Sequence, residues 1–250
     1  MRITLQAMQE HLVRYPCQIA ALMMEPVQGE GGFNYAPREY YVEVFEAAKK
    51  AGLAIWLDEI QTFGRTGRLF AFQTFDLDQY VDVVSAAKML HASIVLFSEE
   101  YNPRPGLVAG TFTGTSASLR VARRVVELLD DGFYGPQGKI TKLSERFAEN
   151  LRKIAEGSCR GLIASRRNIG GMIAFEPFSG TLQDVKSVLM KMFELGVVAF
   201  QCGHGPILVR MLPPFGVMTE SHVDEVCSII ERALLEVAKE NALKAREAKT

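Results

Sequence analysis

An Asp-Glu pair closes the short apolar run "LAIWL", and the chain then turns into the polar loop "QTFGRTG". An apolar run of this length, bounded by loop residues, is typical of a buried strand, and open α/β sheets bind ligands at the carboxyl ends of such strands. Lys88 follows a second apolar run, "VDVVSAA", 30 residues after Asp58. The sequence therefore predicts that a carboxylate and an amine lie at the same edge of one sheet.

Two chemistries use a carboxylate in this place. An Asp-Glu pair can hold Mg²⁺ and water in a P-loop ATPase, but that chemistry needs a phosphate loop of the form G-x-x-x-x-G-K-[ST]. The candidates "GRTGR" and "GPQGK" lack the spacing or the hydroxyl. A carboxylate can also hold the protonated pyridine nitrogen of pyridoxal phosphate, which in addition needs a lysine as nucleophile. Lys88 could supply that amine or be an ordinary surface lysine, and spacing alone leaves both interpretations open.

The elements that would position these residues alternate along the first half of the chain. Pro37 at a helix start and Gly52 just past its end delimit one helix. The patterns predict an α/β fold with a mostly parallel sheet in residues 1–131 and a smaller α+β domain in residues 132–250. We expect strands within 19–25, 53–58, 81–87, 94–98, 171–178, 197–202 and 207–212, and helices over 4–15, 37–52, 116–132, 139–157, 181–196 and from about 221 onward.

Composition narrows the function classes. The 250 residues are 48% hydrophobic and carry 28 Lys plus Arg against 29 Asp plus Glu, so the net charge is −1. Such a chain is globular and has no basic surface that would draw it to nucleic acid or to an acidic membrane. The four cysteines lack C-x-x-C spacing, which predicts buried thiols in a reducing cytoplasm and no metal site. No apolar run approaches the roughly 20 residues that span a bilayer, and no export signal is expected.

Five motifs occur in the order and approximate spacing of one family. The chain resembles the class-III aminotransferases of the ornithine, acetylornithine and 4-aminobutyrate type, which are fold-type-I pyridoxal phosphate enzymes. The "EPVQGEGG" and "DEIQ" pieces are the most specific. The motifs are "MMEPVQGEGGF", "DEIQTFGRTG", "SAAKML", "GTFTGTSA" and "LVRMLPP".

The resemblance assigns cofactor roles residue by residue. It implies that Asp58 contacts the pyridine nitrogen, that Ile60 packs on one ring face and that Gln61 reaches the 3-hydroxyl. Lys88 is similar to the Schiff-base lysine that moves the proton between the substrate α-carbon and the cofactor. Thr111 is similar to the threonine that binds the cofactor phosphate of the partner subunit, which implies a homodimer with shared sites.

Two more residues are similar to the family's substrate-binding pair. Arg210 would hold the α-carboxylate of glutamate or 2-oxoglutarate, a task suited to its bidentate fork. Glu30 would pair with this arginine when an ω-amine substrate without that carboxylate is bound. The alternatives are a structural ion pair of Arg210 with Glu176 or another acid, and a solvated loop carboxylate for Glu30.

The chain also departs from the family pattern. One glycine is missing from "QTFGRTG", "MLHAS" follows the lysine where glycine is common, and "TFTGTSAS" replaces "TFGGNPLA". The family places a Gly-Ser/Thr phosphate cup and an aromatic ring stacker before the "EP" strand, whereas no glycine precedes Gly29 here. The resemblance thus covers the last half to three-fifths of a full enzyme.

Two classes of function follow from these observations. The first is transamination between an amine, such as an ω-amino acid or acetylornithine-like donor, and a 2-oxo acid, carried out by a truncated or split chain with an N-terminal companion half. The second is a catalytically inactive fragment or paralogue that acts as an interaction partner of a full-length relative. In either case we expect uncovered apolar surface, so the isolated chain should be poorly soluble or oligomeric.

Overall fold

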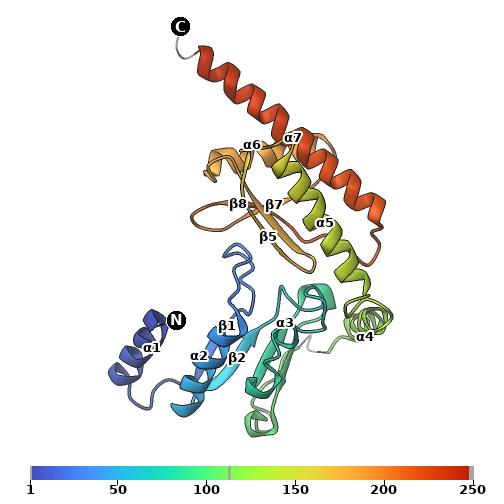
Figure 1. Ribbon diagram of the computed structural model, residues 1–250. Coiled ribbons are helices and arrows are strands. Elements are labelled where there is room, and N and C mark those ends of the chain that lie inside the picture. The colour runs from blue at the N-terminus through green and yellow to red at the C-terminus, as the bar shows by residue number, and fades with distance from the viewer. Residues whose placement is uncertain (1, 112–113, 248–250) are drawn as a thin grey trace. The chain divides into compact units, whose positions relative to one another are not determined.

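The computed structural model describes residues 2–111 and 114–247 (Figure 1). The chain forms two compact units, which are described separately. The first comprises Met1–Val27 and Tyr35–Asp131, and the second comprises Gln28–Asn34 and Gly132–Thr250. The short loop Gln28–Asn34 therefore belongs to the second unit, although both of its flanks belong to the first.

The first unit is built on a four-stranded sheet with the order β1-β2-β3-β4. The strands β1, β2 and β3 run parallel to one another, and β4 pairs with β3 in the antiparallel direction. This mainly parallel sheet confirms the predicted fold class. The strands are β1 (Ala21–Met24), β2 (Ala54–Asp58), β3 (Val83–Ala86) and β4 (Ile94–Phe97).

The core of the first unit lies between the sheet and one helix. The apolar face of α2 buries Tyr41, Val44 and Phe45 against residues of β2 that include Ile55 and Leu57. These side chains are at most 3% exposed. The helices of this unit are α1 (Arg2–Arg14), α2 (Arg38–Lys50), α3 (Ala71–Thr74) and α4 (Ser116–Asp130), with 3₁₀ turns at Asp78–Tyr80, Lys88–Leu90 and Glu99–Tyr101.

Two elements of the first unit expose large apolar side chains. Three consecutive residues of β4 are 43 to 52% exposed, although alternation would bury every second one in a covered strand. The helix α4 exposes four such residues at 37 to 47%. The exposed residues are Val95, Leu96 and Phe97 on β4, and Leu119, Val121, Val126 and Leu128 on α4.

The second unit is an antiparallel sheet covered by helices, with the strand order β5-β6-β8-β7. Its core joins β6 and β8 to the apolar faces of three helices, and Phe147, Phe175 and Ile230 are fully buried there. Its elements are α5 (Lys139–Glu156), β5 (Ile163–Ile169), β6 (Met172–Pro177), α6 (Leu182–Glu194), β7 (Phe200–Cys202), β8 (Leu208–Met211) and α7 (Glu220–Glu247).

An ion pair joins α5 to α7. Arg146 donates from Nε and Nη2 to the two carboxylate oxygens of Asp224 at 2.7 and 2.5 Å. The guanidinium, with help from the Asn150 amide, lowers the pKa of Asp224 from 3.8 to about 2. Because the folded-state pKa lies below the unfolded value, the carboxylate stabilises the fold above pH 3.8, and this contribution disappears as the pH falls through 2.

We expect Asp224→Asn to flatten the acid side of the stability profile. The wild-type chain should lose stability between pH 4 and pH 2 more steeply than the variant, because only the wild type must protonate this paired carboxylate. Urea melts at half-unit pH steps would measure the slope. Glu225→Gln, on the exposed neighbouring position, is the control and should follow the wild type. Equal slopes for all three proteins would contradict the assignment.

Three further observations concern residues 2–111 and 114–247. None of the helices in these ranges combines the length and apolarity needed to cross a bilayer. The same residues contain no group of three or more His, Cys, Asp and Glu side chains placed to hold a metal ion. The expectation of four buried thiols is wrong at Cys17, which is exposed, whereas Cys159, Cys202 and Cys227 are buried.

Candidate active site

Lys88 stands directly after β3 in a strained backbone conformation. Its φ is +44°, in the left-handed region that non-glycine residues rarely adopt. The turn is held by backbone bonds from the N–H groups of Leu90 and His91 to the carbonyls of Ala87 and Lys88, at 3.1 and 3.0 Å. Such strain costs about 1 kcal/mol or more and is concentrated at functional sites. The lysine side chain is exposed, so its amine is accessible.

Asp58 is the last residue of β2 and pairs with Ser85 of the neighbouring strand β3. Ser85 lies three residues before Lys88. This pairing places the carboxylate and the lysine at adjacent carboxyl ends of parallel strands, as the sequence predicts. The Asp58 side chain is half-buried, and its Oδ1 accepts the Ile60 N–H at 2.9 Å. Below it, the Trp56 indole N–H donates to the Ser85 hydroxyl at 2.7 Å and ties the two strands together.

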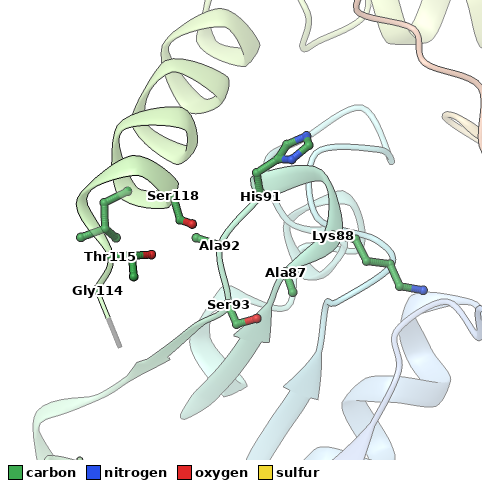
Figure 2. Close-up of a pocket in the computed structure, with 9 residues that line it drawn as sticks. Ala87, Lys88, His91, Ala92, Ser93, Gly114, Thr115 and Ser118 are labelled. Atoms are coloured by element: carbon green, nitrogen blue, oxygen red, sulfur yellow. The ribbon is translucent and has the colours of Figure 1, made fainter. Parts of the chain in front are cut away.

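A cavity of about 450 Å³ opens beside this strand end. Figure 2 shows hydroxyls of Ser93, Thr115 and Ser118 around it, whereas the Lys88 side chain points away from them. Both sequence departures from the family, "MLHAS" and "TFTGTSAS", contribute residues to this cavity. The lining consists of Ala87, Lys88, His91, Ala92, Ser93, Gly114, Thr115, Ser118 and Leu119.

The other predicted cofactor residues lie in two places. Gln61 is buried and Ile60 is half-buried in the loop that follows β2, so both share the strand end with Asp58. Thr111 is exposed in the turn before α4 and does not line the cavity. The structure thus groups the predicted ring-contacting residues and leaves the predicted phosphate-binding threonine apart from them. Phe112 and Thr113 of the same motif lie outside the described residues.

Arg65 fixes the same loop from within. Its Nη1 donates to the Gln61 carbonyl at 2.6 Å. Burial lowers the pKa of this guanidinium to about 10, because desolvation disfavours the charged form. The contact fixes the backbone of Gln61, the residue that the resemblance places at the 3-hydroxyl.

Glu59, the second residue of the Asp-Glu pair, has a structural role that the sequence did not indicate. It is fully buried, and its two carboxylate oxygens accept the N–H groups of Ala71 and Phe72, both at 2.9 Å, as well as the Thr62 hydroxyl. Burial raises its pKa, and the hydrogen bond from Thr62 opposes this effect. Glu59 therefore caps the start of α3 and closes the loop that follows Asp58.

The predicted substrate-binding pair is in contact. Arg210 of β8 and Glu30 of the loop Gln28–Asn34 form an ion pair at 2.6 Å, and both belong to the second unit. The arginine side chain is 13% exposed and the glutamate side chain 65%. Glu176, the alternative partner of Arg210, instead accepts the Ser165 hydroxyl at 2.8 Å.

Comparison with known proteins identifies the family. The model of the aminotransferase class-III family matches residues 2–234. The chain is 31% identical to the 5-aminovalerate aminotransferase of Pseudomonas putida over 89% of its own length, and 30% identical to the acetylornithine aminotransferase of Lactococcus lactis over 87%. It covers 54% and 56% of these two proteins, so the chain spans about half the length of the curated relatives it matches.

Solved structures agree with this result. An ornithine aminotransferase from Toxoplasma gondii, which holds pyridoxal phosphate at partial occupancy in its active site, is 28% identical with a TM-score of 0.80. The match covers 94% of this chain and 55% of that one. The lysine aminotransferase of Mycobacterium tuberculosis is 21% identical with a TM-score of 0.83, over 93% and 53% of the two chains, and shows the fold.

The chain therefore belongs to the class-III aminotransferase family, a family of enzymes whose cofactor is pyridoxal phosphate. The residues present fit this cofactor. A half-buried carboxylate and an accessible lysine stand at adjacent ends of parallel strands, and the lysine is held in a conformation that costs energy. The family and fold expected from the five motifs are confirmed.

Proposed function

We propose that this chain takes part in pyridoxal phosphate-dependent transamination between an amine and a 2-oxo acid such as 2-oxoglutarate. The strained Lys88, three residues after the Ser85 that pairs with Asp58, carries the proposal. The amine would be an ω-amino acid or an acetylornithine-like donor, in line with the names of the relatives. Residues 1–131 would form the C-terminal part of the large cofactor-binding domain, and residues 132–250 the small domain.

The cofactor, when bound, supplies an electron sink for the charge that develops at the substrate α-carbon. The Asp58 carboxylate would hold a proton on the pyridine nitrogen, since a negative charge at this position favours the protonated ring. Ile60 would pack on the ring and Gln61 would donate to the 3-hydroxyl. Lys88 would attach the cofactor through its amine and would take the proton from the α-carbon. Thr111 would bind the phosphate held by a partner subunit.

Arg210 and Glu30 would recognise the substrate carboxylate. The well-buried guanidinium offers a fixed fork for a carboxylate, and the exposed glutamate can rotate away without moving the arginine. One pocket would thereby serve a substrate that carries a carboxylate at this position and another that does not. Binding of 2-oxoglutarate would displace Glu30 from Arg210.

Reductive labelling tests the proposal directly. Pyridoxal phosphate is added to the full chain, the visible absorbance is recorded, and the mixture is reduced with borohydride for peptide mapping. We expect one predominant label on Lys88, lost in Lys88→Ala and kept in Lys50→Ala, which removes another exposed lysine of the same unit. Labels scattered over many lysines and unchanged by Lys88→Ala would overturn the proposal.

The exposed apolar residues of β4 and α4 favour a second candidate function. They suit a chain that must pair, either as a homodimer or with an N-terminal companion half. A catalytically inactive chain that binds a full-length relative would use the same surface. The labelling experiment separates these cases, because an inactive partner would not direct the cofactor to Lys88.

We expect the wild-type chain to sediment above its monomer mass of 27.7 kDa. The substitutions Leu119→Glu and Leu128→Glu together should shift it toward the monomer, since they put a charge on each of the two opposite sides of α4 that expose apolar residues, and such charges oppose burial between chains. Leu182→Glu, at a 42% exposed position of the second unit, is the control. A wild-type chain that sediments as a monomer at all concentrations would contradict this prediction.

A further inference from the structure

The loop that carries Glu30 is closed on itself by backbone hydrogen bonds. The Gln28 N–H donates to the Asn34 carbonyl at 2.9 Å, and the Phe33 N–H donates to the Gln28 carbonyl at 2.7 Å. The Asn34 amide adds bonds to the Gln28 side chain and to the Gly31 carbonyl at 2.9 and 2.8 Å. The loop Gln28–Asn34 is therefore one hydrogen-bonded unit, and the contacts that anchor it fix the position of the Glu30 backbone.

Two contacts anchor this loop. The Gly203 N–H donates to the Glu30 carbonyl at 2.9 Å, and Arg167 of β5 donates from Nη1 to the Gly32 carbonyl. The approach is close: a Cβ on Gly32, whose φ is +106°, would lie 2.9 Å from Arg167 Nη1 and 3.3 Å from Gly203 Cα. Only glycine fits between the two anchors. Arg167 is the side-chain anchor, and it lies 135 residues from Gly32 in the sequence.

Arg167 has no carboxylate partner among residues 2–111 and 114–247, and its guanidinium donates to the Gly32 carbonyl instead of forming an ion pair. It nonetheless shares its surroundings with the Glu30–Arg210 pair. The guanidiniums of Arg210 and Arg167 and the Glu30 carboxylate all act on the buried Cys202 thiol, whose pKa burial raises to about 11. Arg167 is thus a second cation near the Glu30–Arg210 ion pair. Its guanidinium binds the backbone of the loop that carries Glu30.

We propose that Arg167 is a positioning residue that sets how strongly Glu30 competes with a substrate carboxylate for Arg210. With the loop anchored, Glu30 reaches the guanidinium by side-chain rotation alone. Without the anchor, closing the ion pair must also order the backbone of the loop, so Glu30 becomes a weaker competitor. This inference rests on the proposed function, because it concerns the carboxylate subsite of the same transamination.

A double-mutant cycle tests the coupling between the two residues. Calorimetry measures the affinity of the full chain for 2-oxoglutarate in the wild type, E30Q, R167M and the double variant. We expect E30Q to tighten binding about three- to fivefold in the wild-type background, the size expected for a partly exposed ion pair. In the R167M background the same change should alter affinity less than about 1.5-fold. R167K keeps a donor and the charge, and should restore most of the difference.

Salt separates positioning from simple charge coupling. At high ionic strength the electrostatic effect of Arg167 on Glu30 is screened, whereas a contribution from loop order persists. Salt also weakens the Glu30–Arg210 ion pair, so the E30Q effect is compared at each ionic strength as the fraction that R167M removes, and this fraction should persist in 0.5 M salt. An E30Q effect of equal size in both backgrounds, or a fraction removed by R167M that falls to zero in 0.5 M salt while E30Q still changes affinity, would overturn the inference.

Amide hydrogen exchange provides a second measurement that needs no ligand. In R167M the N–H groups of Phe33 and Gly203 should exchange at least about tenfold faster, because both close the anchored loop. R166M is the matched control, since Arg166 is the exposed neighbour on the opposite face of β5. Unchanged exchange in R167M would overturn the inference.

A failure of the Arg167 inference can be distinguished from a failure of the proposed transamination. If R210M binds 2-oxoglutarate as the wild type does, no carboxylate subsite exists for Arg167 to control and the inference is overturned. The borohydride label on Lys88 would still report on the cofactor chemistry in that preparation. Loss of the label together with an intact Glu30–Arg167 coupling would overturn the proposed transamination and leave the positioning role supported.

Discussion

Asp58→Asn should reduce amino-group transfer on the order of 10³-fold, the size typical for loss of one electrostatic contact to a reacting system. The substitution removes the negative charge that would keep the pyridine nitrogen protonated. It preserves an oxygen that can accept the Ile60 N–H, so the local turn should survive. Steady-state rates with 2-oxoglutarate and a panel of ω-amines would measure the effect.

Stability measurements and a control variant separate the loss of the Asp58 charge from any structural damage. Asp58→Asn should leave the free energy of unfolding within about 1 kcal/mol of the wild type, since the single neutral hydrogen bond is retained. Asp78→Asn, at an exposed position of the same unit, is the matched control and should keep full activity. A cofactor methylated on the ring nitrogen, which carries a permanent positive charge, should restore part of the lost rate. Rates within threefold of the wild type would refute the assigned role of Asp58.

Glu59→Ala should cost about 3 kcal/mol of folding free energy, because it leaves three hydrogen-bond donors without their buried acceptor. Three donors converge on this carboxylate from Thr62, Ala71 and Phe72. Glu59→Gln should cost about 1–3 kcal/mol, since its amide NH₂ faces one backbone N–H in place of an acceptor. Denaturant melts would measure both changes. Glu43→Gln, on the exposed face of α2, should remain near the wild type.

The pH dependence gives a further check on Glu59. Burial raises its pKa above 4.5, so its favourable contribution is complete below that pH and is lost as the pH rises through the folded-state value. The wild type should therefore lose more stability than Glu59→Gln between pH 4.5 and neutrality. A steeper loss in the variant would show that the hydrogen bonds outweigh burial at this site.

Most of the fold could be predicted because its elements carry strong local patterns. The strands β1, β2 and β3 are apolar runs bounded by loop residues, and α2 is delimited by Pro37 and Gly52. The strand β5 was missed because its sequence "IASRRNI" replaces the usual apolar alternation with arginine and asparagine. Among the residues that the structure describes it pairs with β6 alone and stands at the sheet edge, where polar side chains can remain in water.

In the candidate site, too, the residues with a local sequence pattern could be predicted and the long-range contacts could not. Asp58 and Lys88 could be placed together from the sequence, because each ends an apolar strand and parallel strands share an edge. The burial of Glu59 could have been inferred by extending the two-residue period of β2, which ends at Asp58, by one position. The contact of Arg167 with Gly32 spans 135 residues and has no local signal. Packing between distant segments decides such contacts.

The assignment of Gln28–Asn34 to the second unit has a practical consequence for dissecting the chain. A fragment cut at the 131/132 boundary would carry Arg167, Gly203 and Arg210 but not the seven-residue segment that satisfies them. Such a fragment would lack one segment of its own unit, and a synthetic peptide spanning 28–34 should bind in its place. Fragment complementation, with Glu30 supplied on the peptide, could then measure the strength of the Glu30–Arg210 contact independently of the cofactor-binding half.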